Sequence, residues 1–99
     1  MTPIFKWNGA YFGFISNGCV FDAVSTYLGW IADDRVWGSD GVYVGQIVEE
    51  NYVLRNTIMV SPIPRVPRVP PIPPVPPVPV INRVGRIPKI GWLDALDDL

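Results

Sequence analysis

The chain has 99 residues, 48% of them hydrophobic and 12% aromatic, and its formal net charge at pH 7 is −1. This length allows one small domain, and the apolar content excludes a disordered polar chain. The chain has no histidine and one cysteine, so it lacks the commonest general base and metal ligand and cannot form an internal disulfide. We therefore expect no catalytic, cofactor-binding or metal-binding residues, and no enzymatic activity.

Charge is distributed unevenly along the chain. Residues 51–90 contain six basic and no acidic side chains, whereas residues 1–50 contain two basic and six acidic ones. A basic segment can contact phosphate groups or an acidic partner, but it can also keep an apolar segment soluble, which is the simpler interpretation. We find neither a secretory leader nor the roughly 18 consecutive apolar residues of a membrane span, so we expect a cytoplasmic protein, with peripheral membrane attachment as the alternative.

An internal repeat of sixteen residues organises the first half of the chain. The motif Tyr-x-Gly-x-Ile occurs three times without a gap, and a second set of apolar residues keeps the same spacing. Two sets in phase seldom arise by chance, so they indicate a repeated structural unit. The residues of the motif, to which we assign a structural role, are Tyr11, Gly13, Ile15, Tyr27, Gly29, Ile31, Tyr43, Gly45 and Ile47.

Each unit consists of two short apolar runs separated by turn residues, which predicts a β-hairpin. Asn8-Gly9 and Asp40-Gly41 are two-residue turn signals, whereas the second unit has Ala23-Val24-Ser25 and should form a different loop. A glycine within a strand weakens it unless the space is needed, so we expect each repeat glycine either to be covered by the nearby tyrosine or to mark a bend in a tightly curved sheet. The first three units are predicted at residues 4–18, 19–34 and 35–50.

The fourth unit is predicted to be split by an insertion. It starts at residues 51–56, and its second half reappears at residues 87–93, where Gly91 and Trp92 match Gly29 and Trp30. Four hairpins provide eight strands, enough to close an all-β antiparallel sheet into a shallow barrel without edges. Residues 94–99 form an acidic C-terminal tail, and the spacing of apolar residues from 92 to 99 predicts one helical turn.

The insertion, at residues 62–81, has a period of three. Proline occupies one set of positions, isoleucine or valine a second, and proline or arginine the third. Polyproline II has three residues per turn, so the sets predict three faces of a left-handed rod. From Pro64 to Pro79 the rod spans about 47 Å, wider than a domain of this size, so it should project from the hairpins or bend back over them. We expect its aliphatic face to lie against the sheet or against other copies of the chain, and the strand near Ile90 to complete its own sheet or a neighbour's.

These motifs resemble the 4-fold β-flower family, small bacterial proteins in which β-hairpin petals surround a shallow barrel. The resemblance is carried by the Tyr-x-Gly-x-Ile copies, the segment Glu50–Asn56, the Pro-Arg-Val-Pro-Arg run and the ending Asp-Ala-Leu-Asp-Asp-Leu, and it covers essentially the whole chain. It implies a fold but no molecular function, because none is assigned to the family. An open ribbon of MORN-type repeats, which also use Tyr-x-Gly, fits less well, since the later glycines of that repeat are missing.

Three functions are compatible with the sequence. The first, which we favour, is a self-associating structural or interaction module, a homo-oligomer in which the proline-rich rod makes the assembly or partner contacts. The second is a module that binds a lipid surface or a small apolar ligand. The candidate contacts for a protein partner or anionic lipid are Arg65, Arg68, Arg83 and Arg86. The third, binding of single-stranded nucleic acid, is disfavoured because the basic residues do not alternate with the aromatic ones.

Overall fold

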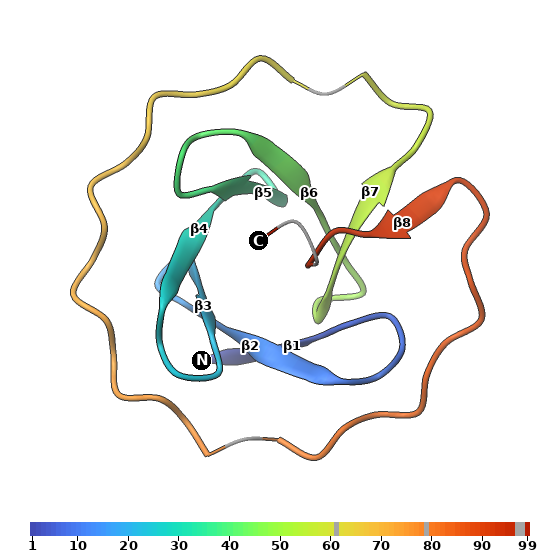
Figure 1. Ribbon diagram of the computed structural model, residues 1–99, viewed down its shortest axis with the longest axis horizontal. Coiled ribbons are helices and arrows are strands. Elements are labelled where there is room, and N and C mark those ends of the chain that lie inside the picture. Colours follow the sequence, from blue (N-terminus) through green and yellow to red (C-terminus); the bar gives the residue numbers. More distant parts are fainter. Residues whose placement is uncertain (61, 79, 97–98) are drawn as a thin grey trace.

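The computed structural model of the protein describes residues 1–60, 62–78, 80–96 and 99. Within these residues eight β-strands form one sheet in sequential order (Figure 1). The predicted all-β fold is therefore confirmed, whereas three residues of the predicted rod and tail, Pro79, Asp97 and Asp98, lie outside the described residues. The strands are β1 (Thr2–Phe5), β2 (Tyr11–Ser16), β3 (Cys19–Asp22), β4 (Tyr27–Ala32), β5 (Arg35–Gly38), β6 (Tyr43–Val48), β7 (Tyr52–Asn56) and β8 (Trp92–Asp94).

The strands form four hairpins, here called petals, around a common centre (Figure 1). Petal 1 is β1–β2, petal 2 is β3–β4, petal 3 is β5–β6 and petal 4 is β7–β8. The sheet closes where Phe5 of β1 is the parallel partner of Tyr52 of β7, and the Phe5 backbone N–H donates to the Asn51 carbonyl at 2.8 Å. Closure thus uses seven strands rather than eight, because β8 is three residues long and the chain then turns into the barrel at Ala95.

The core contains an equivalent residue from each repeat. Ile4, Val20 and Val36 are sixteen residues apart and fully buried, but the fourth place is taken by Val53, seventeen residues after Val36. Val53 comes one residue later than the repeat predicts because the turn before β7 is longer. The turn between β6 and β7 has three residues, whereas the turns between β2 and β3 and between β4 and β5 have two. An odd shift reverses which side chains face inward. The longer turn therefore decides which face of β7 enters the core.

The residues that follow β8, where the sequence predicted an acidic tail, enter the barrel. Ala95 and Leu96 are 0% and 1% exposed and join the core cluster, and the Ala95 N–H donates to the Val53 carbonyl at 3.0 Å. The predicted helical turn begins later than the spacing indicated: residues 92–94 form β8, and Leu96 lies in a 3-10 turn in which its carbonyl accepts the Leu99 N–H at 3.2 Å. The match of Gly91 to the strand glycines is also wrong, because Gly91 precedes β8 in a turn with φ +82°. The second half of petal 4 is therefore shorter and later than predicted.

The repeat glycines allow neighbouring strands to approach more closely than a side chain permits. A Cβ atom at Gly29 would lie 1.9 Å from the Trp37 carbonyl oxygen, and one at Gly13 would lie 2.1 Å from that of Phe21. The register of β3 with β4 shifts between Val20 and Phe21. That of β5 with β6 shifts at the equivalent place, just before Trp37. Of the two interpretations of these glycines, the structure supports the bend in a tightly curved sheet.

The insertion runs once around the outside of the petals as a belt, which we define as residues 57–60, 62–78 and 80–91 (Figure 1). It contains neither helix nor strand, and its polyproline II conformation stays a prediction. The protein is a disc with extents of 37 × 35 × 18 Å. Its perimeter of about 113 Å matches the roughly 112 Å that 36 steps of polyproline II cover between the paired residues Asn56 and Trp92.

This match of lengths answers two questions left by the sequence. The rod bends around the disc rather than projecting from it, because its two ends are held together by the pairing of β7 with β8. Strand β8 completes the sheet of its own chain, so exchange of this strand with a neighbour is not required to return the chain to the barrel. The insertion has the length that one turn around the petals needs.

The substitution Gly29→Ala should destabilise the fold by about 3–5 kcal/mol, because its Cβ overlaps a backbone carbonyl that can move only with its strand. The matched control is Gly38→Ala on the paired strand, where the nearest atom is the flexible Asp40 carboxylate oxygen at 2.9 Å and the loss should be about 1 kcal/mol. Urea denaturation of both variants measures the difference. Equal losses would contradict the close-approach role of Gly29.

Candidate functional site

The belt is fixed to three petal tips by hydrogen bonds spaced nine residues apart along it. Nine residues are three turns of polyproline II, so the same face of the belt would meet each tip. The hydrogen bonds run from the Arg65 N–H to the Gly41 carbonyl (2.9 Å), from the Ser25 hydroxyl to the Pro74 carbonyl (2.6 Å), and from the Arg83 N–H to the Gly9 carbonyl (2.8 Å). The fourth petal holds the two ends of the belt.

Glycine is needed at the tips of petals 1 and 3 for two reasons. Gly9 and Gly41 have φ values of +96° and +87°, and a Cβ at either position would lie 1.9 Å from a carbonyl oxygen of the belt. Petal 2 has no glycine in its turn, and there the Ser25 side chain makes the contact. The sequence indicated these turns but not their second role, because contact with a distant segment leaves no local pattern.

One face of the belt lies over the aromatic rings of the petals. Its cations are within about 6 Å of ring centroids, the range of a cation–π interaction. The distances to the centroids are 4.5 Å for Arg65 over Trp37, 5.1 Å for Arg68 over Trp30, 4.2 Å for Arg83 over Phe5, 4.7 Å for Arg86 over Tyr52, and 5.1 Å for Lys89 over Trp92. The four arginines named as candidate partner contacts are thus gathered in two pairs against the chain's own rings.

Arg83 and Arg86 meet at Tyr52, next to the closure of the barrel. Burial raises the pKa of Tyr52, but hydrogen bonds from both guanidinium groups, together with their charges, outweigh it and place the pKa below its ordinary value. Arg86 also forms an ion pair with Glu49, and Arg83 donates to the Asn51 side-chain oxygen at 3.4 Å. This cluster ties the belt to the seam between β1 and β7.

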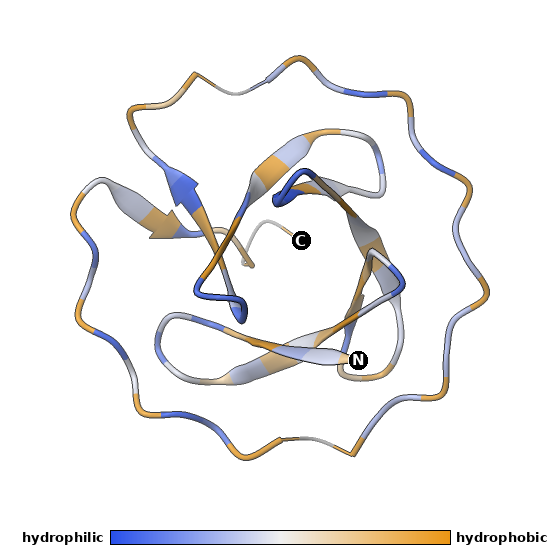
Figure 2. Ribbon diagram, turned by 180° about the vertical axis from the view of Figure 1, so that it is seen from behind, coloured by the Kyte–Doolittle hydropathy of each residue, from blue (hydrophilic) through white to orange (hydrophobic). Residues whose placement is uncertain are grey.

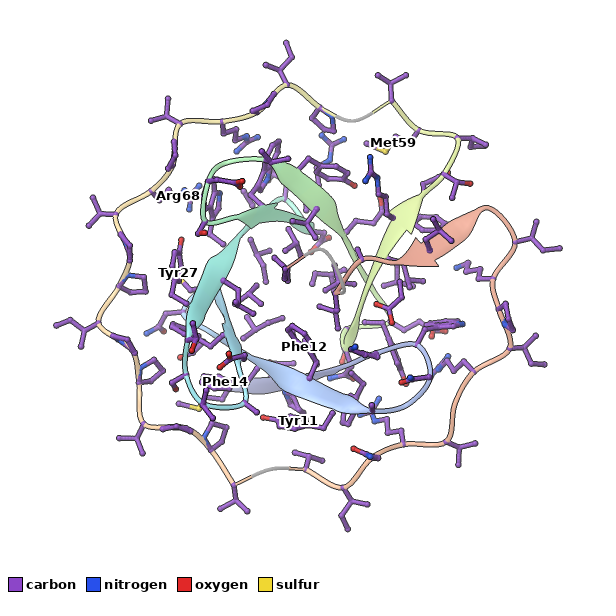
Figure 3. All side chains as sticks on the ribbon, in the orientation of Figure 1. Tyr11, Phe12, Phe14, Tyr27, Met59 and Arg68 are labelled. Atoms are coloured by element: carbon purple, nitrogen blue, oxygen red, sulfur yellow. The ribbon has the colours of Figure 1, made fainter. Side chains whose placement is uncertain are left out.

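A second face of the belt points away from the disc and forms its rim. Aliphatic side chains project outward all around the belt (Figure 3), and hydrophobic positions recur along it at short intervals (Figure 2). The rim consists of eleven β-branched residues at every third position, 83–99% exposed: Val60, Ile63, Val66, Val69, Ile72, Val75, Val78, Ile81, Val84, Ile87 and Ile90. Of the two positions expected for this face, contact with the sheet is wrong, because the arginine and proline face takes that place, whereas contact with other copies of the chain stays a prediction.

The rim is large for an exposed apolar surface. Burying one valine or isoleucine side chain is worth about 1.5–3 kcal/mol at 25 cal/mol per Å², which corresponds to roughly 60–120 Å² for each side chain and roughly 700–1,300 Å² for the whole rim. The largest apolar patch on a typical monomeric protein covers about 300–600 Å². The rim therefore has the character of a contact surface.

A small cavity lies at the seam between petals 1 and 4. Its volume is about 190 Å³, and its walls are mainly apolar, from Trp7, Leu54, Pro88, Trp92 and Leu93, with the side chains of Lys89 and Asp94 at its edge. The Asp94 carboxylate accepts the Trp7 and Leu96 backbone N–H groups, so it is used in holding the seam together. Ligand pockets usually exceed about 300 Å³, which makes this cavity a weaker candidate than the rim.

The repeat motif itself contributes to the scaffold. Ile15, Ile31 and Ile47 pack against the core cluster. Burial raises the pKa values of Tyr11 and Tyr43, and the Tyr11 N–H donates to the Asn82 side-chain oxygen of the belt at 2.9 Å. These residues therefore contact the core of the barrel and the belt.

The geometry defines a closed barrel of β-hairpin petals encircled by a proline-rich belt. The chain belongs to the 4-fold β-flower family, because the family model described as "4-fold beta flower protein" matches residues 2–94. Comparisons with curated proteins and with solved structures returned no match. Within the described residues, no helix is long and apolar enough to cross a membrane, and no three metal-ligating side chains gather in one place.

The substitution Gly41→Ala should release the belt from petal 3. The added Cβ would overlap the Arg65 carbonyl, so protection of the Arg65 amide against hydrogen exchange should fall at least about tenfold. Gly18→Ala is the matched control, since Gly18 also has a positive φ of +74° but a Cβ there would meet no atom within 4 Å. If NMR-detected exchange at Arg65 changed equally in both variants, the contact would not hold the belt.

Tyr52 should be the first tyrosine to ionise. Its pKa lies below the ordinary value, whereas those of Tyr11, Tyr27 and Tyr43 lie above it. An ultraviolet titration of tyrosinate should show an early step that Tyr52→Phe removes. Because the folded-state pKa is the lower one, the stability of the wild type relative to this variant should increase as pH rises through that pKa and level off above about pH 10. A titration without the early step would contradict the arginine contacts.

Proposed function

We propose that the protein is a non-enzymatic interaction module in which the petals are the scaffold and the belt is the contact element. The observation that supports this function is the rim, eleven exposed β-branched side chains facing away from the disc. Apolar side chains are normally buried when the fold offers a place for them, and here the face of the belt with the arginines occupies that place. The rim is then available to a partner outside the chain.

The belt is suited to binding because its shape is set before a partner arrives. Prolines restrict its backbone, the petal tips hold it at nine-residue intervals, and its ends are joined by β7 and β8. A segment that is already ordered loses less conformational entropy on binding. Arg65 and Arg68, two of the candidate partner contacts, are engaged with the chain's own rings, so the rim is the surface left for recognition.

The same shape limits how two copies of the chain would associate. A rim of radius about 18 Å is convex, so two discs placed edge to edge touch over only a few side chains. Stable interfaces bury about 1,200–2,000 Å² in total, more than such a contact supplies. Self-association through the rim therefore requires several neighbours around each disc, and a deformable partner covers the rim more readily.

Photo-crosslinking in cells that produce the protein tests this function. A photoreactive amino acid in place of Val75, a rim residue that is 83% exposed, should give adducts with a partner on irradiation. The control is the same amino acid in place of Glu50, which is exposed in the turn between β6 and β7 and does not belong to the rim. Adduct yields at Val75 no higher than at Glu50 would show that the rim contacts nothing and would overturn the proposal.

A further inference from the structure

The rim is uniform, but the charge behind it is not. Between Arg68 and Arg83 the belt has no charged side chain, and its described residues there are valine, isoleucine, proline and one asparagine. We call this part the neutral sector, residues 69–78 and 80–82. The positions that carry arginine elsewhere on the petal-facing side are here Pro71, Pro74, Pro77 and Val80. About two fifths of the ring are therefore apolar on both the outer and the inner side.

The petal behind the neutral sector also exposes an aliphatic side chain at its tip. Petal 2 bonds to the middle of this sector through Ser25 and Pro74, and the neighbouring Val24 is 74% exposed. The tip of petal 1 exposes Asn8, and that of petal 3 exposes Asp40 together with a less exposed aliphatic side chain, Val42 at 48%. The unusual turn of the second repeat thus adds a further exposed aliphatic side chain to the uncharged part of the disc.

Because the belt is curved, the middle of the neutral sector protrudes beyond the line that joins the two flanking arginines. Fifteen steps of about 3.1 Å separate Arg68 from Arg83, and on a circle of radius about 18 Å this arc rises about 13 Å above the line that joins them. Val75 stands near the top of the arc. Elements that lie in a membrane interface bury their apolar face about 5–10 Å into the boundary of headgroups and acyl chains. The arc is high enough for that depth while its arginines stay at headgroup level.

We propose that the neutral sector inserts edge-on into an anionic lipid membrane, with Arg68 and Arg83 near the headgroups on either side. This inference rests on the proposed function and names the class of its partner. Charge complementarity supports it, since residues 51–90 carry six basic and no acidic side chains. A basic residue near an anionic surface contributes about 1 kcal/mol in attraction.

A second copy of the chain fits the same surface less well. Two belts in contact carry charge of the same sign, so their arginines repel. Their convex edges also meet over few side chains. Acyl chains, in contrast, close around a curved edge without a preformed groove. Both charge and shape therefore favour lipid as the occupant of the neutral sector.

Vesicle flotation of the full chain tests this orientation. The wild type should float with phosphatidylcholine vesicles that contain phosphatidylglycerol, float weakly with phosphatidylcholine alone, and lose binding as salt is raised, because the attraction is screened. The triple variant I72T/V75T/V78T should lower the partition coefficient at least about 100-fold, since each side chain loses most of its apolar insertion. Threonine keeps the β-branch, so the stiffness of the belt is retained.

The matched control is V60T/I63T/I90T, which removes three rim residues on the other side of the disc. It should float like the wild type, and both variants should keep the wild-type urea midpoint because the substituted side chains are 83–99% exposed. Absence of wild-type flotation, or an equal loss in both variants, would overturn the proposal. If I72T/V75T/V78T instead abolished an oligomer seen by sedimentation while vesicle binding was absent, a second copy would cover the rim. The lipid assignment would then fail and the interaction function would stand.

Discussion

The belt is a closed loop of fixed length, and most of the structure depends on this constraint. Its ends are held together where β7 pairs with β8, so it must match the perimeter of the petals. A shorter belt would prevent that pairing, and a longer one would leave the petal tips. Only β8 then leads the chain inward, where Ala95 and Leu96 complete the core. The outer ring and the centre of the barrel are therefore coupled through three residues of strand.

The belt reverses the usual distribution of residue types. Its cations lie over buried aromatic rings, whereas its aliphatic side chains face outward. Guanidinium groups are suited to the inner position because they stack on ring faces and still hydrogen-bond at their edges, as Arg83 and Arg86 do at Tyr52. The aliphatic side chains of the rim cannot hydrogen-bond, so their exposure to water is unfavourable. The arrangement stabilises the inner contacts and leaves the rim as the surface from which a partner gains most.

The petals and the belt differ in symmetry, and this difference matters for function. The petals repeat four times with small departures, whereas the charges of the belt fall in two groups on either side of the neutral sector. A symmetric scaffold alone presents no preferred edge. The belt, together with the turn of petal 2 at Val24 and Ser25, gives the disc one edge that differs from the rest. The proposed membrane orientation follows from this asymmetry.

The sequence by itself determined the hairpins, their repeat and the period of the insertion, because turn residues, strand glycines and three-residue spacing act on neighbouring positions. The tertiary structure decided the rest. Closure between β1 and β7 and the burial of Leu96 depend on contacts between distant segments, which leave no local pattern. The spacing placed the arginines and the valines on separate faces but could not say which faced inward. That choice depended on the aromatic rings and the glycines at the petal tips, which only the folded chain brings to the belt.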